Sequence, residues 1–318
     1  MDRSSALTPL RAAVTAFARR YPADRWCVGL SGGADSLALT AVAAALKPTT
    51  ALIVDHGLQT GSAEVAATAA AQARQLGCVA AQVISVAVGT EGGPEAAARA
   101  ARYAALDAAR DGAPVLLAHT LDDQAETVLL GLGRGSGPRS IAGMRVWDAP
   151  WGRPLLEVRR ADTVAACAEL GLTPWHDPHN TDPRYTRVRL RTEVLPLLED
   201  VLAGGVAPAL ARTAAALRED NDALDVLAAD HLAALRTDEG LTVTGLEDLP
   251  TALRRRVIRG WLLSVGATAL TDVQLRAVDA LVGDWHGQGG AAVTSPLRYQ
   301  RLVVSRRAGM LTVAARPV

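Results

Sequence analysis

The most informative stretch of the sequence is VGLSGGADSLALTAVAAAL, residues 28–46. It joins an apolar run typical of a buried strand to a Ser-Gly-Gly turn and then to an alanine-rich run of helical length. A plain turn between strand and helix needs at most one glycine, and here two glycines stand between Ser31 and Asp35. Because glycine lets a phosphate approach the free N–H groups at the start of a helix, the stretch predicts a phosphate-binding loop. The alternative is a tight turn in which Ser36 only caps the helix.

Size and composition describe an ordinary globular protein. The 318 residues allow one large domain or two medium ones, and 49% of them are hydrophobic and 21% charged. The sequence has no apolar run of about 18 residues and no signal-peptide pattern, which predicts a cytoplasmic protein without a membrane span. The formal net charge of zero gives no overall sign of nucleic-acid binding, although arginine is concentrated in residues 184–191 and 254–259. The sequence indicates no protein partner and leaves the oligomeric state open.

The three cysteines, Cys27, Cys78 and Cys167, lie far apart and form no C-x-x-C pair. This spacing argues against a disulfide framework, a zinc site and an iron–sulfur cluster. Cys27 and Cys78 stand among apolar residues, so we expect them to be small buried side chains.

Short apolar runs alternate with alanine-rich runs between residues 26 and 131. We expect strands at residues 26–30, 50–56, 79–88 and 114–119, and helices at residues 36–46, 62–76 and 94–110. Strands that alternate with helices of this length form a parallel sheet covered on both faces, so the predicted fold class is α/β with a Rossmann-like sheet. Such sheets bind ligands beyond the C-terminal ends of their strands.

The rest of the chain predicts further helices and a second domain. The spacing of Leu7, Leu10, Val14 and Phe17 indicates an amphipathic N-terminal helix. Residues 129–144 are rich in glycine and are expected not to be regular throughout. We place a catalytic domain at residues 1–204 and a smaller, mainly helical domain at residues 205–318, with a hinge around residues 201–208. Further helices are expected at residues 162–170, 187–199, 209–235 and 251–265, and a small hairpin within residues 291–315.

A second chemical signal is AHTLDDQAETVLL, residues 118–130. His119 follows an apolar strand, and Asp122, Asp123 and Glu126 open a helix, where the helix dipole favours acidic side chains. Carboxylates at the end of a strand, close to a phosphate loop, suit Mg²⁺ that is shared with substrate phosphates. The plain alternative is a helix start capped by acidic residues.

The loop SGGADS lacks both the G-x-x-x-x-G-K-[ST] and the G-x-G-x-x-G spacing. It resembles instead the pyrophosphate loop of N-type ATP pyrophosphatases, which split ATP between its α- and β-phosphates. Further motifs make the chain similar to the tRNA(Ile)-lysidine synthetase family from about residue 26 to residue 199, and more weakly beyond. The motifs that carry this resemblance are SGGADS, VDHGL, ARAARYAAL, HTLDDQAET, GRGSG, RPLLEV and HDPHNTDPRYTRVRLRTEVLPLLE. One position departs from the family pattern, because Val188 stands where asparagine is usual.

The resemblance implies a reaction and a set of site residues. ATP adenylates the wobble cytidine of an isoleucine tRNA with the anticodon CAU, and the ε-amine of free L-lysine then displaces AMP to give lysidine. The residues implied to bind ATP are Ser31, Gly32, Gly33, Ala34, Asp35, Ser36, Asp55 and His56. Those implied to act in catalysis are Asp35, His119, Asp122, Asp123, Arg102 and Arg191, with Mg²⁺ held by Asp35 and Asp123.

A cationic track for tRNA is expected from the arginines, because a guanidinium offers two parallel donors to a phosphate. The candidates are Arg134, Arg187, Arg254, Arg255 and Arg256. For each of them, a solvated surface salt bridge is the plain alternative.

Three other classes of protein share part of this pattern. A tRNA-thiolating relative would need cysteines for an iron–sulfur cluster, and an amide-forming synthetase would not need the arginine-rich residues after Asn180. A nucleotide-binding sensor without catalysis would keep SGGADS but would have no use for HTLDDQAET.

Overall fold

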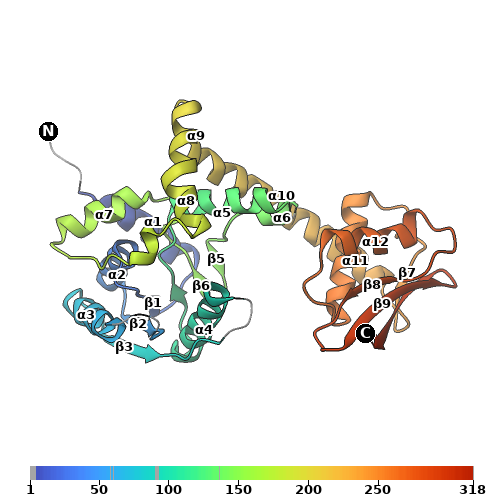
Figure 1. Ribbon diagram of the computed structural model, residues 1–318, viewed down its shortest axis with the longest axis horizontal. Coiled ribbons are helices and arrows are strands. Elements are labelled where there is room, and N and C mark those ends of the chain that lie inside the picture. Colours follow the sequence, from blue (N-terminus) through green and yellow to red (C-terminus); the bar gives the residue numbers. More distant parts are fainter. Residues whose placement is uncertain (1–4, 58, 60, 90–92, 136, 318) are drawn as a thin grey trace. The chain divides into compact units, whose positions relative to one another are not determined.

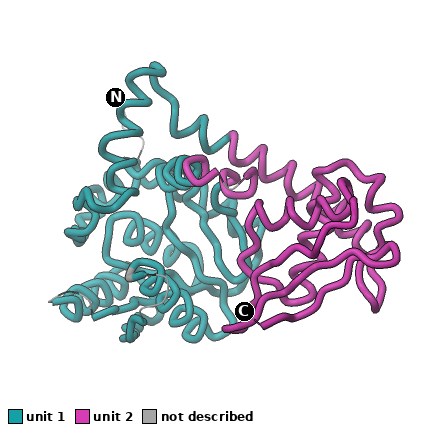
Figure 2. The backbone as a smooth tube through the Cα atoms, turned by 45° about the vertical axis from the view of Figure 1, so that its right-hand side comes forward, with its two compact units in different colours: residues 1–130, 143–212 teal, residues 131–142, 213–318 magenta. Residues whose placement is uncertain are grey.

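The computed structural model describes residues 5–57, 59, 61–89, 93–135 and 137–317. They divide into two compact units, Met1–Leu130 with Gly143–Arg212, and Gly131–Ala142 with Thr213–Val318 (Figure 2). The sequence suggested one boundary between residues 204 and 205. In the structure the division falls inside the helix α10 (Val206–Leu235), and residues 131–142 group with the C-terminal unit.

The first unit contains a six-stranded sheet in the order β3-β2-β1-β4-β6-β5. Its strands are β1 (Trp26–Gly29), β2 (Thr49–Asp55), β3 (Ala80–Ser85), β4 (Val115–Leu116), β5 (Trp147–Asp148) and β6 (Trp151–Gly152). Every neighbouring pair is parallel except β5 with β6, which is antiparallel at the edge. The predicted parallel α/β sheet is therefore confirmed, with one antiparallel strand added.

Helices cover both faces of this sheet (Figure 1). Side chains of successive residues in a strand point to opposite faces, so Val28 packs into one hydrophobic core and Cys27 into another. The first core contains residues of α1 (Leu7–Arg20), α2 (Ala34–Leu46), α3 (Ser62–Gln75) and α7 (Arg160–Glu169). The second contains Leu106 of α4 (Pro94–Ala109). Burial on both faces explains why β1 and β4 read as continuous apolar runs.

The helix α5 (Leu121–Arg134) runs further than the sequence suggested. Its glycines indicated irregular structure soon after Thr127, and that expectation is wrong for residues 129–134. The reason is a close approach of two backbone segments, because a Cβ built on Gly131 would lie 2.0 Å from the carbonyl oxygen of Ser140. A short helix, α6 (Pro138–Ile141), supplies that carbonyl.

The chain after α7 forms one turn of 3₁₀ helix (Pro178–Thr181) and then a broken helical segment. This segment consists of α8 (Thr186–Arg189), a π-helical turn (Leu190–Val194) and α9 (Leu195–Val201). π-Helical turns occur often at functional sites, because they re-aim a side chain within a helix. Gly204 and Gly205 both have positive φ and separate α9 from α10.

The second unit has its own hydrophobic core around the buried Trp261. Its further helices are α11 (Thr251–Ser264) and α12 (Asp272–Gly283). The predicted hairpin proves to be part of a four-stranded antiparallel sheet in the order β7-β10-β9-β8. The strands are β7 (Leu241–Thr242), β8 (Ala291–Thr294), β9 (Gln300–Arg307) and β10 (Met310–Pro317).

Of the helices that the structure describes, none is by itself long and apolar enough to cross a membrane. Thr186–Val201 and Val206–Leu235 pass that test of length and composition only as a pair, with a bend of 95° between them.

Candidate active site

The strand order brings the two sequence motifs to one place. β1 lies between β2 and β4, so the connections leaving β1 and β4 diverge at the point where the strand order reverses. In open α/β sheets, ligands bind in the crevice at this point. The glycine loop follows β1, and the segment from Ala118 to Thr120 follows β4. The two motifs therefore meet at the edge where a ligand is expected.

The glycine loop holds the start of α2 open to an anion. Gly32 has a φ of +83°, a conformation that favours glycine, and its carbonyl accepts a 2.9 Å hydrogen bond from the N–H of Trp175. The hydroxyl of Ser36 donates to the carbonyl of Gly33 (2.9 Å) and accepts from the N–H of Ser31 (3.2 Å). The helix begins after Gly33 without a side-chain cap. Ser36 therefore stabilises the loop through hydrogen bonds and does not cap the helix. The first N–H groups of α2 are available to bind a ligand.

Asp35 points from the first turn of α2 toward α7. One of its oxygens accepts a hydrogen bond from the hydroxyl of Thr163, and the other lies 3.3 Å from Nε of Arg160. Burial raises the pKa of Asp35, and the contacts with Thr163 and Arg160 oppose this effect without cancelling it. Two residues of α7 thus orient a carboxylate beside the phosphate loop.

Asp123 faces the same arginine from α5. It accepts hydrogen bonds from the backbone N–H (2.8 Å) and the hydroxyl (2.7 Å) of Thr120, and from Nη2 of Arg160 (2.6 Å). Burial alone would raise the pKa of Asp123, but Arg160 and the two bonds from Thr120 outweigh it, so this pKa is lowered. Asp123 is therefore a fixed negative charge at neutral pH.

Arg160 links the acidic residues of the site. Its guanidinium contacts Asp35, Asp123 and, at 3.5 Å, Glu126, while its backbone N–H donates to Asp122 at 2.8 Å. Burial would lower the pKa of Arg160, yet the surrounding carboxylates raise it. The bond to Asp122 fixes the first turn of α7, so Asp122 positions Arg160 and does not line either pocket described below.

Glu126 is completely buried, and it holds the broken helical segment against α5. Its carboxylate lies 2.8 Å from Nε of Arg191 and 3.3 Å from Nη1 of Arg187, in addition to its contact with Arg160. Arg191 belongs to the π-helical turn, which directs its side chain toward the site. Val188, the residue that departs from the family pattern, is buried.

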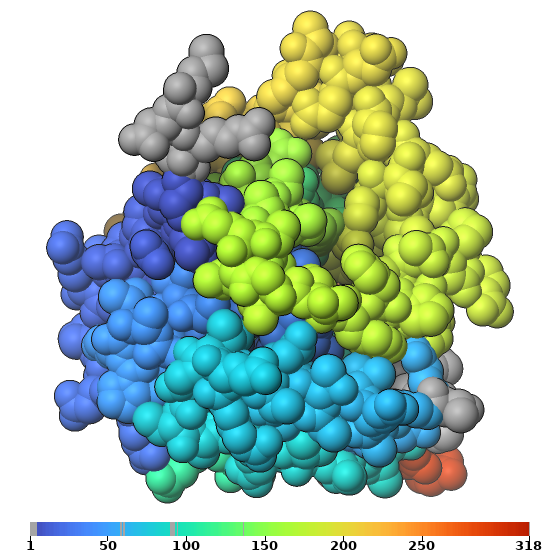
Figure 3. All heavy atoms as spheres, turned by 90° about the vertical axis from the view of Figure 1, so that its left-hand side faces the viewer, coloured from blue at the N-terminus to red at the C-terminus, as the bar shows by residue number. Residues whose placement is uncertain are grey.

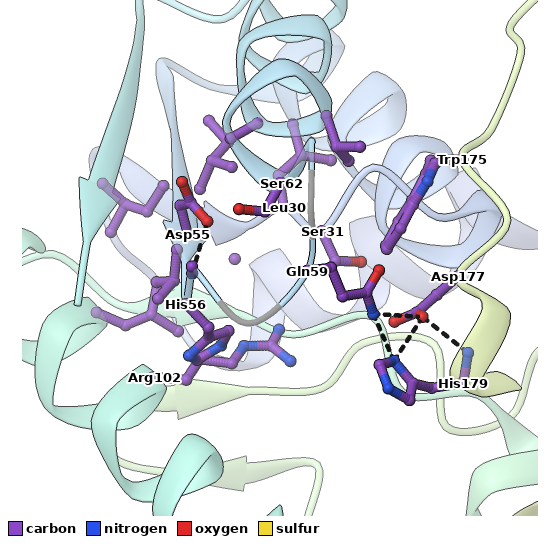
Figure 4. Close-up of a pocket in the computed structure, with 18 residues that line it drawn as sticks. Leu30, Ser31, Asp55, His56, Gln59, Ser62, Arg102, Trp175, Asp177 and His179 are labelled. Atoms are coloured by element: carbon purple, nitrogen blue, oxygen red, sulfur yellow. Dashed lines mark hydrogen bonds and ion pairs between the residues drawn. The ribbon is translucent and has the colours of Figure 1, made fainter. Parts of the chain in front are cut away.

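Two adjoining pockets open above this sheet edge. The first, of about 290 Å³, has apolar lining residues that include Leu30, Ile53 and Val65. Asp55, His56 and Arg102 also line it (Figure 4). The second, of about 460 Å³, is more polar. Its lining includes Ser31, Gly33, Ala34, Asp35, Ser36, Arg102, His119, Asp123, Arg160 and Arg191. Arg102 lines both pockets, and burial lowers the pKa of its guanidinium.

The segment after α7 closes one side of both pockets. Trp175 and Asp177 line both, and Gln59 donates to Asp177 at 3.1 Å from the loop that follows β2. His179 contacts the same two side chains, so three residues from two loops form a small network (Figure 4). Figure 3 shows this yellow-green segment lying against the light-blue helix α3, where Gln72 donates to the carbonyl of Thr173.

His119 is kept uncharged by its surroundings. Burial lowers its pKa from 6.5 to about 3, and Arg153, Arg102 and Arg99 act in the same direction, while Asp123 alone opposes them. Its Nδ1 is buried and has no hydrogen-bond partner among the described residues. A pKa near 3 makes His119 a weak proton acceptor at neutral pH. Its unpartnered Nδ1 is instead available for a hydrogen bond with a ligand.

The depressed pKa of His119 predicts a specific pH dependence of stability. The unfolded chain binds a proton at His119 below about pH 6.5, whereas the folded chain does so only near pH 3. The contribution of His119 is therefore complete above pH 6.5 and is lost as the pH falls from there toward 3. In urea unfolding at several pH values, H119Q is expected to lose less stability over this range than the unsubstituted protein. H176Q, at an exposed histidine of the same unit, is the control; parallel profiles for H119Q and the unsubstituted protein would contradict the assignment.

Comparisons with known proteins agree with this geometry. The model of the PP-loop domain family matches residues 7–198, and that of the TilS substrate binding domain matches residues 241–309. The tRNA(Ile)-lysidine synthase of Mycobacterium tuberculosis (strain H37Rv) is 68% identical over the full length of both chains. The chain belongs to the tRNA(Ile)-lysidine synthase family. The family member from Nocardia farcinica is 65% identical over 90% of each chain.

A solved structure shares the fold at much lower identity. The U34-tRNA thiolase NcsA from Methanococcus maripaludis, described with its [4Fe-4S] cluster, has a TM-score of 0.53 and 18% identity, covering 67% of this chain and 80% of that one. The likeness shows a shared fold. Cys27 in β1, Cys78 before β3 and Cys167 in α7 are all free and buried. Burial of Cys27 and Cys78 was expected from their apolar neighbours in the sequence.

Asp35 and Asp123 are the two carboxylates that the sequence suggested as ligands for Mg²⁺. Among the described residues, no group of three or more His, Cys, Asp or Glu side chains is arranged to hold a metal ion. Asp35 and Asp123 nevertheless converge on the same guanidinium, and they offer the oxygen donors that Mg²⁺ prefers. Mg²⁺ usually takes one or two carboxylates together with phosphate oxygens and water. The pair therefore fits an ion that arrives with a nucleotide.

The arginines expected to bind tRNA lie in different surroundings. Arg187 contacts Glu126 in the first unit, and Arg134 lies exposed at the end of α5, where residues group with the second unit. Arg254 and Arg255 both pair with the buried Asp279 of α12, at 2.6 and 2.8 Å. Arg256 pairs with Asp225 of α10. The run at residues 254–256 thus ties three helices of the second unit together, and this geometry favours a structural role over tRNA contact.

Asp279 gives a test of that structural role. In D279N, two partly buried guanidiniums lose their counterion, and we expect the free energy of unfolding of the second unit to fall by about 2 kcal/mol. The matched control is D272N, because Asp272 also pairs with an arginine of α12 but is exposed; its expected change is within about 0.5 kcal/mol. Equal unfolding free energies of the two variants in chemical denaturation would refute the structural assignment.

Arg160 is the residue of the site that sequence reasoning missed. A local signal was present, because a basic side chain in the first turn of a helix opposes the helix dipole and needs an acidic partner. Arg160 opens α7 two residues after the end of the motif RPLLEV. Its partners lie 34, 37 and 125 residues away, and that distance concealed them.

Proposed function

We propose that this protein is a cytoplasmic ligase that joins free lysine, through its ε-amine, to carbon 2 of the wobble cytidine in an isoleucine tRNA with a CAU anticodon. One observation carries the proposal: the glycine loop, the carboxylates Asp35 and Asp123, and the neutral His119 line a single polar pocket. Membership of the lysidine synthase family supports the same conclusion.

The reaction has two steps that balance. In the first, the carbonyl oxygen at carbon 2 of the cytidine attacks the α-phosphorus of ATP, the bond to the β-phosphate breaks, and pyrophosphate leaves. In the second, the ε-amine of lysine forms a bond to carbon 2, the bond from that carbon to oxygen breaks, and AMP departs with the oxygen. The amine gives up a proton in this second step.

The two pockets suit the two parts of ATP. The first pocket, which is lined by apolar side chains and by Asp55 and His56, has the character of a nucleoside site. The adjoining loop at residues 31–36 presents backbone N–H groups and the N-terminus of α2, which suit the pyrophosphate. Arg102 lies where the pockets join, in a position to contact the α-phosphate.

Two charged groups complete the site. Asp35 and Asp123 would hold Mg²⁺, which when bound neutralises phosphate charge. His119 is our candidate for a hydrogen bond to the substrate, because it is neutral at pH 7 and its Nδ1 has no partner in the described part of the chain. The negative charge of Asp35 and Asp123 that Mg²⁺ does not neutralise would attract the ammonium group of lysine into the pocket.

The test uses the purified full chain, labelled lysine, ATP and a transcript of the isoleucine tRNA with a CAU anticodon. Incorporation of lysine that requires both ATP and this tRNA is expected. A methionine tRNA with the same anticodon serves as the specificity control. No incorporation by folded protein that binds ATP would overturn the proposal.

A further inference from the structure

The outer face of the four-stranded sheet in the second unit has an unusual composition. Leu302, Val304 and Leu311 point into the core, and Figure 1 shows α11 and α12 on one side of the sheet. Because side chains alternate along a strand, Arg301 of β9 and Arg316 of β10 point to the opposite face. Both arginines are exposed. From residue 285 to residue 318 the sequence contains no aspartate or glutamate, so the strands β8, β9 and β10 carry no acidic residue.

The register places two like charges side by side. Arg301 is the direct partner of Arg316 in the antiparallel ladder, and residues paired in this way have Cβ atoms about 5 Å apart. Like charges directly opposite each other destabilise a sheet. Within the described residues, neither guanidinium has a carboxylate partner. Arg301 and Arg316 therefore place two neighbouring guanidinium groups on this face without a carboxylate counterion among the described residues.

An exposed aromatic residue stands two positions before Arg301 in the chain. Tyr299 stands directly before β9, its side chain is 85% exposed, and its φ of +61° is uncommon for a bulky residue. The preceding loop also exposes Leu297. A tyrosine ring in solvent, two residues from a pair of guanidiniums, is the combination that stacks on an unpaired base and grips the adjacent phosphate.

We propose that Tyr299, Arg301 and Arg316 form a contact surface for the tRNA substrate. The two guanidiniums bind one phosphate, and the tyrosine ring stacks on an unpaired base. RNA fits this surface better than an acidic protein segment, because a base offers the planar face that the ring requires and a phosphate accepts from both guanidiniums. This inference rests on the proposed function, which supplies the tRNA.

Charge reversal at Arg316 tests the surface without weakening the fold. In R316E, the new carboxylate faces Arg301 and replaces a repulsive pair by an attractive one, so thermal stability is expected to be equal or higher. Affinity for the CAU-anticodon tRNA is expected to fall about tenfold, and the dependence of affinity on salt to weaken by one to two charges. The Michaelis constant for tRNA is expected to rise as the affinity for tRNA falls, while the Michaelis constant for ATP stays unchanged. The matched control is R276E, at an exposed arginine of α12 on the helical side of the unit.

Tyr299 is tested by two substitutions. Y299F keeps a ring that can stack and is expected to bind tRNA within about twofold of the unsubstituted protein. Y299G removes the ring and suits the positive φ, so it is expected to fold well and to bind about five-fold or more weakly. If tRNA affinity and its salt dependence are unchanged in both R316E and Y299G, these residues do not contact tRNA, and the proposed surface is refuted. Lysine incorporation would in that case still support the proposed function. Failure of the unsubstituted protein to bind any tRNA would instead refute the proposed function.

Discussion

D35N is expected to lower the rate of lysidine formation by about 100-fold or more while the protein stays folded. Asparagine keeps the shape of the side chain and can still accept the hydrogen bond from Thr163, but it removes the charge that faces Arg160 and the phosphate loop. With that charge the site also loses one of the two carboxylates proposed to hold Mg²⁺, the ion that would neutralise phosphate charge during adenylation. Single-turnover incorporation of lysine, with circular dichroism as the check on folding, measures both effects.

The matched control for this variant is D148N, because Asp148 is exposed on the edge strand β5 and lines neither pocket. Its turnover is expected to equal that of the unsubstituted protein. If D35N also turned over at a near-normal rate, Asp35 would have no part in the reaction. Asp123 would then be the remaining carboxylate of the proposed Mg²⁺ pair.

E126Q is expected to have the largest effect on stability. The carboxylate is completely buried and faces Arg160, Arg187 and Arg191, so its removal leaves three guanidiniums without their shared counterion. Breaking a buried ion pair in this way costs about 3 kcal/mol. Because Arg160 and Arg191 also line the polar pocket, their displacement is expected to lower kcat/KM by about 100-fold.

The exposed pair formed by Arg189 and Glu193 provides the control for this prediction. E193Q alters a carboxylate of the same helical segment, and its expected effect on the free energy of unfolding is within about 0.5 kcal/mol. Chemical denaturation of both variants gives the comparison. A free energy of unfolding for E126Q within that range would contradict the anchoring role of Glu126.

The sheet and its phosphate loop were predictable because the physical signals are local. A strand buried on both faces is apolar at every position, as residues 26–30 are. The signal for a phosphate loop is contained in six consecutive residues, 31–36. The end of α5 was not predictable in the same way. Gly131 lies inside a helix because the carbonyl of Ser140 approaches it, and that contact is a property of the packed chain.

The roles of the arginines depend still more on tertiary contacts. Residues 254–256 look like a solvated cationic patch in the sequence, but Asp279, which neutralises two of them, lies 24 and 25 residues away on another helix. Arg160 was missed for the same reason. Arg301 and Arg316 show the converse, because only the strand register brings these two distant residues face to face.

In the proposed reaction, the loop at residues 31–36 and the adjoining acidic pocket form one adenylating site. The direct measurement is the stoichiometry of a single turnover with lysine, the CAU-anticodon isoleucine tRNA and ATP labelled in its α-phosphate to follow AMP or, in a parallel reaction, in its γ-phosphate to follow pyrophosphate. One AMP and one pyrophosphate are expected for each lysine incorporated, with no ADP. Lysine incorporation accompanied by ADP and phosphate, or ATP cleavage that does not require the tRNA, would contradict the proposed reaction.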